Sequence, residues 1–112
     1  MQDLICGNDV MDYDHAQLML NLNVLKKKHI ENVVEMLCQD IDLHSSHEEH
    51  LMYDSKYDMV EVVLHLADHH TRFELIKKHV AAGEIDEAIA SMEKHIKKYD
   101  IPLGKWLNQQ KT

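Results

Sequence analysis

The stretch DLHSSHEEHLM, residues 42–52, concentrates side chains that bind metals or transfer protons. Within it His44 and Glu48 are four residues apart, and His65 and His69 repeat this spacing further along the chain. On a helix, residues four apart lie on one face, one turn from each other. Imidazole nitrogens and carboxylate oxygens are ligands for divalent transition metals. The pattern therefore indicates paired metal ligands on two helices.

The elements that must carry these pairs are helical. Apolar residues recur at steps of three and four through most of the chain, and no stretch alternates apolar and polar residues long enough to indicate a strand. Asp9 or Asp12 would cap the first helix, and Gly83 would end the third. Pro102 would prevent the fourth helix from continuing. We expect helices at about residues 10–27, 31–53, 59–82 and 85–99, and a short C-terminal tail at 102–112.

Length and composition fit one domain over residues 1–112. With three glycines, one proline and 45% apolar residues, the chain suits long uninterrupted elements around a single core. Four helices with short connections pack as neighbours that alternate in direction. The predicted fold class is therefore all-α, an antiparallel up-down-up-down four-helix bundle.

Each predicted helix carries at least one histidine in its apolar stripe, so these side chains should face the core. Burying an unpaired charge costs on the order of several kcal/mol, and a bound cation removes that cost. His95 and Asp100 are five residues apart, and both point inward only if the last helix departs from ideal geometry near its end. Seven ligands exceed the needs of one tetrahedral zinc and suit two five- or six-coordinate ions bridged by carboxylates. The candidate metal ligands are His15, His44, Glu48, His65, His69, His95 and Asp100.

Two other metal motifs fit the sequence less well. The run from His47 to His50 is one residue shorter than the HExxH motif of zinc proteases, so its two imidazoles would not lie one turn apart. Ferritin-like di-iron bundles use Glu-x-x-His, and no histidine here has a glutamate three residues before it. A zinc protease and a carboxylate-rich oxidase are therefore both disfavoured.

The cysteines and the remaining histidines receive simpler interpretations. Cys6 and Cys38 are too few for an iron–sulfur site and are expected as free thiols, with Cys38 filling the core. A nucleophilic cysteine beside a histidine base stays open as an alternative. The other histidines are expected in solvent or at helix edges, and three of them, His47, His70 and His79, are candidates for contact with the ligands. This group comprises His29, His47, His50, His70 and His79.

The charge of the chain limits its partners. A formal net charge of −8 argues against nucleic acid or an anionic membrane surface, since either would require clustered lysine and arginine. No apolar run approaches the roughly 20 residues needed to cross a bilayer. The N-terminal MQDLICGNDV lacks the basic and apolar regions of a secretory signal. We therefore expect a cytoplasmic protein.

Motifs from all four predicted helices form one joint pattern. Residues 11–23, MDYDHAQLMLNLN, are similar to a first-helix pattern of Ile-Asp, His, Leu-Phe and Ile-Asn. Residues 44–52 follow H-x-x-x-E-E-x-L-M, residues 65–69 follow H-x-x-x-H, and residues 95–100 follow H-I-x-x-x-D. Over about residues 10–100 the chain thus resembles the hemerythrins, specifically the single-domain bacterial and archaeal hemerythrin-like proteins.

The third helix departs from this pattern. Phe73 falls four rather than three residues after His69, and His70 as the ligand would restore the spacing. The residue four positions before His70 is Leu66, which cannot bind iron. The ligand prediction therefore keeps His65 and His69.

The resemblance implies two non-haem iron ions, which share carboxylates and a solvent-derived oxo or hydroxo bridge. One iron would be bound by His65, His69 and His95, the other by His15 and His44, and both would be bridged by Glu48 and Asp100. The second iron would keep an open position for dioxygen. Imidazole and carboxylate ligands also accept zinc, manganese or cobalt, so these residues do not by themselves select iron.

The function that the resemblance implies is reversible binding of dioxygen by an oxygen carrier, store or sensor, with no catalytic turnover required. Two other classes stay open. One is a di-iron oxidase or peroxidase that consumes oxygen, peroxide or nitric oxide. The other is an iron- or redox-sensing module that acts through an unidentified protein partner.

Overall fold

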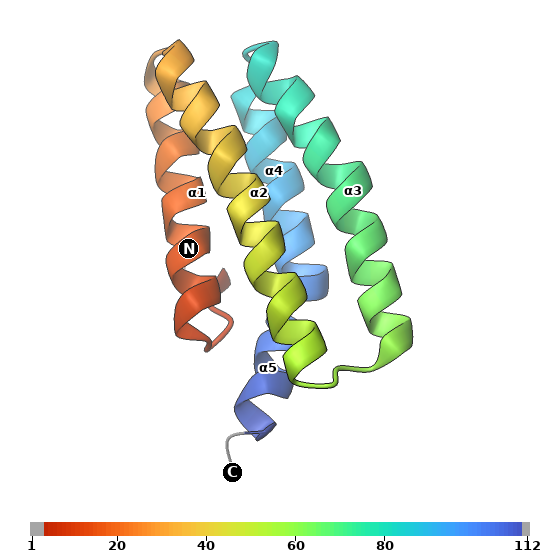
Figure 1. The fold of residues 1–112 in the computed structure, drawn as a ribbon. Coiled ribbons are helices and arrows are strands. Elements are labelled where there is room, and N and C mark those ends of the chain that lie inside the picture. The colour runs from red at the N-terminus through yellow and green to blue at the C-terminus, as the bar shows by residue number, and fades with distance from the viewer. Residues whose placement is uncertain (1–3, 111–112) are drawn as a thin grey trace.

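The computed structural model describes residues 4–110, which form four long helices side by side. In Figure 1 the chain runs up α1 (Asp9–Lys27), down α2 (Glu31–Asp54), up α3 (Met59–Ala81) and down α4 (Ile85–His95). α4 continues directly into a π-helical turn, η2 (Ile96–Asp100), and a last helix, α5 (Ile101–Gln110). The expected all-α antiparallel four-helix bundle is confirmed. No helix within residues 4–110 combines the length and the apolar character that crossing a membrane requires.

The helix ends are fixed by local hydrogen bonds. Asn8 caps α1, because its side-chain oxygen accepts from the backbone N–H of Met11 at 3.1 Å. The expected caps were wrong, since Asp9 is the first residue of α1 and Asp12 makes a different contact. The Asp12 carboxylate accepts from the backbone N–H of Cys6 at 2.8 Å. It therefore holds the segment before α1 against the first turn of that helix.

The last residue of α3 is Ala81, and Gly83 terminates the helix as predicted. Gly83 has a φ of 80°, a left-handed conformation that a glycine adopts without a steric penalty. Its N–H donates to the carbonyl of Val80 at 3.1 Å, and the N–H of Glu84 donates to the carbonyl of His79 at 2.8 Å. These two bonds satisfy the last carbonyls of α3 and let the chain reverse into α4.

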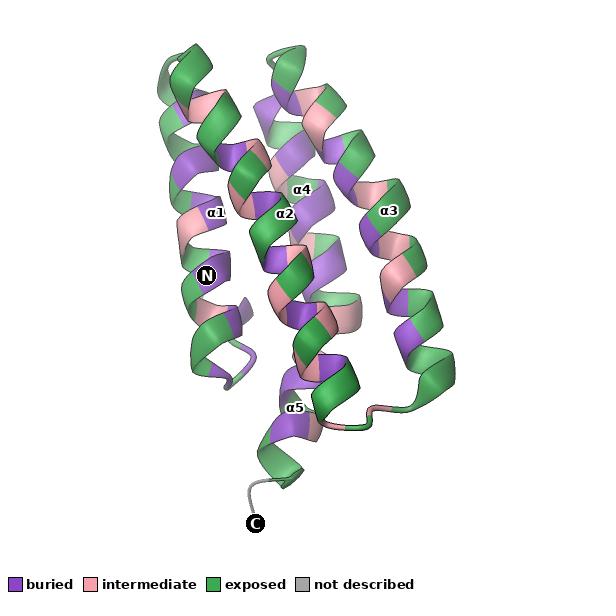
Figure 2. Cartoon of the chain, viewed as in Figure 1, coloured by how far each residue is buried: buried purple, intermediate pink, exposed green. Residues whose placement is uncertain are grey.

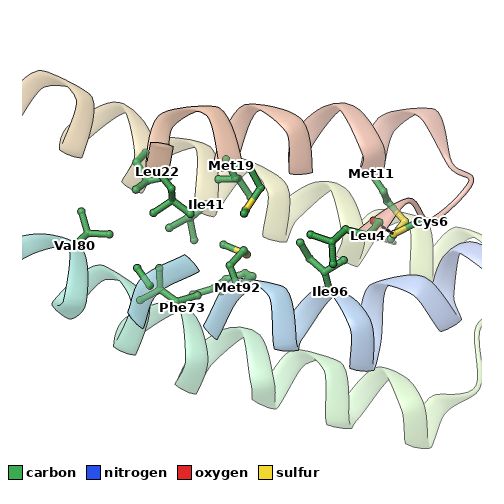
Figure 3. Packing of buried hydrophobic residues seen from close by; sticks show 14 of the residues in the cluster. Leu4, Cys6, Met11, Met19, Leu22, Ile41, Phe73, Val80, Met92 and Ile96 are labelled. Carbon is green, nitrogen blue, oxygen red and sulfur yellow. Dashed lines mark hydrogen bonds between the residues drawn. The ribbon is translucent and has the colours of Figure 1, made fainter. Parts of the chain in front are cut away.

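Apolar side chains from every helix fill the interior of the bundle. Figure 2 shows buried residues on the faces that the helices turn toward one another. Figure 3 shows these side chains packed along the bundle, from Val80 to Met11 and Cys6. Burying a large aliphatic side chain stabilises the fold by about 1.5–3 kcal/mol. Those with no measurable exposure include Leu18, Leu22, Leu37, Ile41, Met52, Ile76, Met92, Ile96 and Leu103.

The C-terminal segment is helical, which corrects the expected tail at 102–112. Residues 102–110 of that range are described, and α5 contains all of them. Pro102 does not stop the chain because it is the second residue of α5, and a proline is tolerated in the first turn of a helix. The preceding turn is wide, since the N–H of Ile101 donates to the carbonyl of Ile96, five residues back. The fourth helix therefore changes its winding at η2 instead of ending there.

α5 packs against the N-terminal arm, defined as residues 4–8. Gly104 approaches the backbone carbonyl of Cys6 so closely that a Cβ at this position would collide with the oxygen. Further along α5, the ring of Trp106 packs on Tyr57, with 5.9 Å between ring centroids. Both Cys6 and Gly104 are buried. The arm and α5 together therefore close the end of the bundle beyond η2.

Gly104→Ala should destabilise the protein, because the added methyl group meets the Cys6 carbonyl, a backbone atom that cannot move alone. We expect the free energy of unfolding to fall by about 1–3 kcal/mol, measured by urea denaturation followed by circular dichroism. Lys105→Ala, at the exposed next position, is the control and should change this free energy by less than about 0.5 kcal/mol. Unchanged stability in the Gly104 variant would show that the arm does not pack on α5 here.

Candidate metal centre

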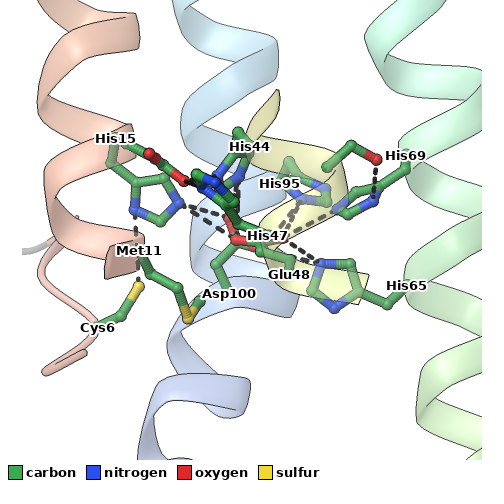
Figure 4. A network of polar contacts seen from close by, with 12 residues as sticks. Cys6, Met11, His15, His44, His47, Glu48, His65, His69, His95 and Asp100 are labelled. Carbon is green, nitrogen blue, oxygen red and sulfur yellow. Dashed lines mark hydrogen bonds and ion pairs between the residues drawn. The ribbon is translucent and has the colours of Figure 1, made fainter. Parts of the chain in front are cut away.

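Seven polar side chains meet in the middle of the bundle, and they are the seven predicted metal ligands. Figure 4 shows the labelled histidines and carboxylates pointing toward one another from different helices. Their donor atoms fall into two overlapping groups, within each of which all atoms lie less than 4.8 Å apart. We call the whole set the central cluster. Its members, each at most 4% exposed, are His15, His44, Glu48, His65, His69, His95 and Asp100.

Helical spacing supplies the ligand pairs of α2 and α3. On α2 the Nε2 atom of His44 lies 3.0 Å from a carboxylate oxygen of Glu48, one turn away. On α3 the ring centroids of His65 and His69 are 4.5 Å apart. The ring of Phe73 stacks on that of His69, with 4.7 Å between their centroids. His70 is exposed. The structure thus places His69, and not His70, in the central cluster.

The π-helical turn explains why His95 and Asp100 both face inward. In an α-helix, residues five apart are separated by about 140° around the axis and cannot share a face. In η2 the hydrogen bonds span five residues, so the winding is wider and the two side chains align. The Nε2 atom of His95 lies 3.1 Å from Oδ1 of Asp100. The expected departure from ideal geometry is therefore present, as one π turn between the two residues.

Glu48 divides its two oxygens between two groups of imidazoles. Oε1 lies 3.0 Å from Nε2 of His65 and 3.0 Å from Nε2 of His69. Oε2 lies 3.0 Å from Nε2 of His44 and 3.6 Å from Nε2 of His15. The side chain of Glu48 is fully buried, so these imidazoles take the place of water around its carboxylate.

Asp100 repeats the same division. Its Oδ1 lies 2.9 Å from Nε2 of His65 and 3.1 Å from Nε2 of His95. Its Oδ2 lies 2.8 Å from Nε2 of His15 and 3.4 Å from Nε2 of His44. Both carboxylates thus connect a three-histidine group, His65, His69 and His95, to a two-histidine group, His15 and His44. An arrangement of two carboxylates between two groups of imidazoles could hold metal.

Several atoms that face this centre lack a hydrogen-bond partner within the described residues. They lie close to one another but not in a geometry in which one donates a hydrogen bond to the next. Buried polar atoms without partners cost free energy in a folded protein. A cation between them would remove this cost, because it binds the lone pairs of all of them. They include His44 Nε2, Glu48 Oε2, His95 Nε2 and Asp100 Oδ1. The central cluster therefore fits a metal ion by its donor atoms as well as by its residue types.

The carboxylates and imidazoles of the central cluster shift one another's pKa values. Burial lowers the pKa of His95, but the Asp100 carboxylate and its neighbours outweigh burial and raise it to about 10. Burial raises the pKa of Glu48 and Asp100, but the surrounding imidazoles hold both well below their usual range. Burial lowers the pKa of His69, and for this residue the lowering prevails. Without metal, the cluster is thus held by ion pairs between imidazolium and carboxylate groups.

A further set of residues contacts the outward nitrogens of the imidazoles. Nδ1 of His95 lies 2.6 Å from Oδ2 of Asp68, and Nδ1 of His69 lies 3.0 Å from the hydroxyl of Ser45. Asp68 was not among the predicted site residues. Its position directly before a candidate ligand is a signal in the sequence, but its contact with α4 depends on how two helices pack.

Asp14 contacts the two-histidine group in a similar way. Its Oδ2 lies 3.5 Å from Nδ1 of His44 and 2.7 Å from Nδ1 of His47. The predicted contact between His47 and the ligands is therefore indirect and passes through Asp14, which sequence reasoning also missed. On the same side of the cluster, Nδ1 of His15 lies 3.8 Å from the thiol of Cys6.

The remaining histidines and the cysteines lie outside the central cluster. His29 pairs with Glu31 at 2.8 Å, and His50 is exposed. The predicted contact of His79 with the ligands is wrong, since His79 bonds Glu84 at 3.0 Å, near the end of α3. His29, His50 and His79 therefore lie at the surface or at helix ends, outside the central cluster.

Both cysteines are free thiols, as expected. Cys38 is only half-buried and is not part of the apolar core, so the expectation that it fills the core is wrong. Burial raises the pKa of the Cys6 thiol far above its usual range, which suppresses the reactive thiolate. The open alternative of a nucleophilic cysteine is therefore disfavoured at Cys6, although His15 lies beside it.

A surface groove of about 240 Å³ reaches the edge of the cluster between α2 and α3. Ser45, His69, His70 and Phe73 line it together with charged side chains of both helices. Ser45 and His69 thus separate the groove from the buried carboxylates. A small molecule that enters the groove meets the outer side of the three-histidine group.

Comparison with family models, with curated proteins and with solved structures finds no match to this chain. The chemical interpretation of the site therefore rests on the geometry of its side chains. That geometry is a buried cluster of five imidazoles and two carboxylates that could hold metal.

Metal binding should release protons, because neighbouring carboxylates raise the pKa of His15, His44, His65 and His95, which therefore keep their protons to a higher pH than a free imidazole does. An imidazole must lose its proton to bind a metal, so the apparent affinity should rise with pH. The proton release should shrink as the pH approaches about 10, the pKa of His95. Zinc titration calorimetry in buffers of different ionisation enthalpy measures both quantities.

His50→Ala is the control for this titration, because His50 is exposed on the same helix as His44 and should leave the proton release unchanged. Zinc binding at neutral pH without any proton release would contradict the ion-paired description of the metal-free cluster.

Proposed function

We propose that this chain is a non-haem di-iron protein that binds dioxygen reversibly, as an oxygen carrier, store or sensor similar to the hemerythrins. One observation carries the proposal. Glu48 and Asp100 each direct one carboxylate oxygen to the three-histidine group and the other oxygen to the two-histidine group. Two bridging carboxylates and five neutral imidazoles suit a pair of divalent first-row metals. The sequence motifs carry the resemblance independently of this geometry.

The two metal positions would differ in the number of their protein ligands. One donor group contains His65, His69 and His95 with both carboxylates, and the other contains His15 and His44 with the same carboxylates. The second position therefore has one imidazole fewer. A small ligand such as dioxygen would bind there, because that metal has room for it.

The chain's own residues would favour reversible binding over oxidation of other molecules. When bound, a ferrous pair supplies the two electrons that dioxygen takes up and returns. The sequence offers six candidates for an apolar lining of the site. Five of them, Leu18, Met19, Leu22, Val62 and Ile96, are buried, and the sixth, Leu51, is half-buried. Such a lining limits access of water and protons to the site. Imidazole-rich ligation also favours the ferrous state more than a carboxylate-rich site would.

A second candidate is a di-iron oxidase or peroxidase, and one contact favours it. The side chain of His47 is 37% exposed and bonds Asp14, which lies beside His44. These side chains form a row of polar contacts from solvent to the two-histidine group, because His47 bonds Asp14 at 2.7 Å and Asp14 lies 3.5 Å from Nδ1 of His44. An enzyme that reduces oxygen or peroxide needs protons at that place. Nitric oxide would be an alternative substrate of the same site.

The test is an anaerobic reconstitution with ferrous iron, followed by addition and removal of dioxygen. We expect two irons per chain, one for each donor group, and a visible band that appears with dioxygen and fades when it is removed. Rapid irreversible oxidation with consumption of a reductant would favour the enzyme instead. Absence of stoichiometric iron would overturn the di-iron assignment.

Matched histidine variants should separate ligands from neighbours. His69→Ala should remove at least one iron per chain, because its Nε2 faces Glu48. His70→Ala, at the exposed next position, should retain both irons and the oxygen-dependent band. Iron content and the visible spectrum measure the difference. Loss of iron in the His70 variant alone would show that His70, and not His69, is the second ligand on α3.

A further inference from the structure

One imidazole of the central cluster has an outward contact that is much stronger than those of the others. Nδ1 of His95 lies 2.6 Å from Oδ2 of Asp68, a distance at the short end for a charge-assisted hydrogen bond. His69 contacts the neutral hydroxyl of Ser45 at 3.0 Å, and His15 contacts the thiol of Cys6 at 3.8 Å. Nδ1 of His65 has no hydrogen-bond partner within the described residues.

Asp68 is itself held in place by a permanent cation. Nε of Arg72, one turn further along α3, donates to the same Oδ2 atom at 2.9 Å. The guanidinium also reaches across to α4, where its Nη1 lies 3.4 Å from the hydroxyl of Ser91. Ser91 precedes His95 by one turn on α4. The result is a closed set of contacts, in which Arg72 fixes Asp68 and Asp68 fixes His95.

The equivalent carboxylate of the two-histidine group is bound more loosely. Asp14 is 3.5 Å from Nδ1 of His44, and its shorter contact, at 2.7 Å, is to His47. The side chains of Asp14 and Asp68 are similarly buried, at 10% and 14% exposure, but the partner that Asp14 contacts closely, His47, is 37% exposed. The two halves of the cluster therefore differ in how firmly a carboxylate is attached to a ligand imidazole.

We propose that Asp68, held by Arg72, is a positioning residue that fixes the ring of His95 and strengthens it as a metal ligand on the three-histidine side. This inference rests on the proposed metal centre. It adds a residue that would make the metal at the three-histidine group more electron-rich than the metal at the two-histidine group. The hydrogen bond from Nδ1 to Asp68 keeps the proton on the outer nitrogen, so the lone pair of Nε2 faces Asp100 and the metal. A charged acceptor also increases electron donation by the ring, which stabilises the oxidised metal at this position.

The test compares zinc affinity, a measurement that needs neither iron nor oxygen, among matched variants. Asp68→Asn retains a hydrogen-bond acceptor but removes the charge, and Asp68→Glu restores the charge. We expect zinc affinity, measured by competition with a chelator, to fall about 10–100-fold in the Asn variant and to recover partly in the Glu variant. Asp86→Asn makes the same substitution at an exposed ion pair with Lys26 on α4 and α1, and should leave the affinity unchanged.

A second measurement separates positioning from simple structural support. In the iron-loaded protein, Asp68→Asn should raise the reduction midpoint potential and leave iron per chain unchanged. Arg72→Met removes the bonds to Asp68 and to Ser91 but leaves the Asp68 carboxylate beside His95, so it should lower stability and change the potential less than Asp68→Asn does. Urea denaturation of the same variants measures stability.

The outcomes distinguish this inference from the proposed function. If the unsubstituted chain binds two metals while the Asp68→Asn variant matches its zinc affinity and potential, the role of Asp68 is overturned and the di-iron proposal stands. If the unsubstituted chain binds no metal, both fail. A loss of affinity equal in Asp68→Asn and Asp86→Asn would also overturn the inference, because it would reflect net charge alone.

Discussion

The structure depends on two carboxylates that lie in the centre of a bundle with no access to water. Glu48 and Asp100 are fully buried, and a buried charge without partners would cost several kcal/mol, on the order of the stability of a small domain. Five imidazoles surround them with their Nε2 atoms inward. Every helix of the bundle contributes at least one of these groups, so closing the bundle removes all seven side chains from water together.

That requirement explains features of the backbone that apolar packing alone would not demand. The π turn at η2 brings Asp100 onto the same face as His95, at the expense of regular α-helical hydrogen bonds. Single π turns often occur at functional sites for this reason. Beyond η2, α5 packs so tightly on the N-terminal arm that only glycine fits at position 104. The arm in turn places Cys6 beside His15, so the end of the bundle and the central cluster are in direct contact.

Helical periodicity can be predicted from the sequence, whereas contacts between helices cannot. His44 and Glu48 could be assigned because residues four apart share a face, and the same rule gave His65 and His69. The π turn could not be located, because no pattern in residues 96–100 marks it and only the inward position of Asp100 required it. Asn8 as the cap of α1 depends on the path of the arm, which the packing of α5 determines. Pro102 was interpreted as a helix end because a proline is tolerated only in the first turn of a helix, and the sequence did not show that α5 begins at Ile101.

The same distinction applies within the metal centre. The seven inward side chains are visible in the sequence as polar residues that interrupt apolar stripes. Asp14 and Asp68 each stand immediately before a histidine of the cluster, yet each contacts an imidazole on another helix, His44 and His95 respectively. Adjacent residues on a helix point about 100° apart, so a carboxylate next to one ligand is directed toward the neighbouring helix and its ligand. Pairing each ligand of one helix with the acidic residue beside a ligand of the preceding helix would therefore have found both outer contacts, provided that the order of helices around the bundle is known.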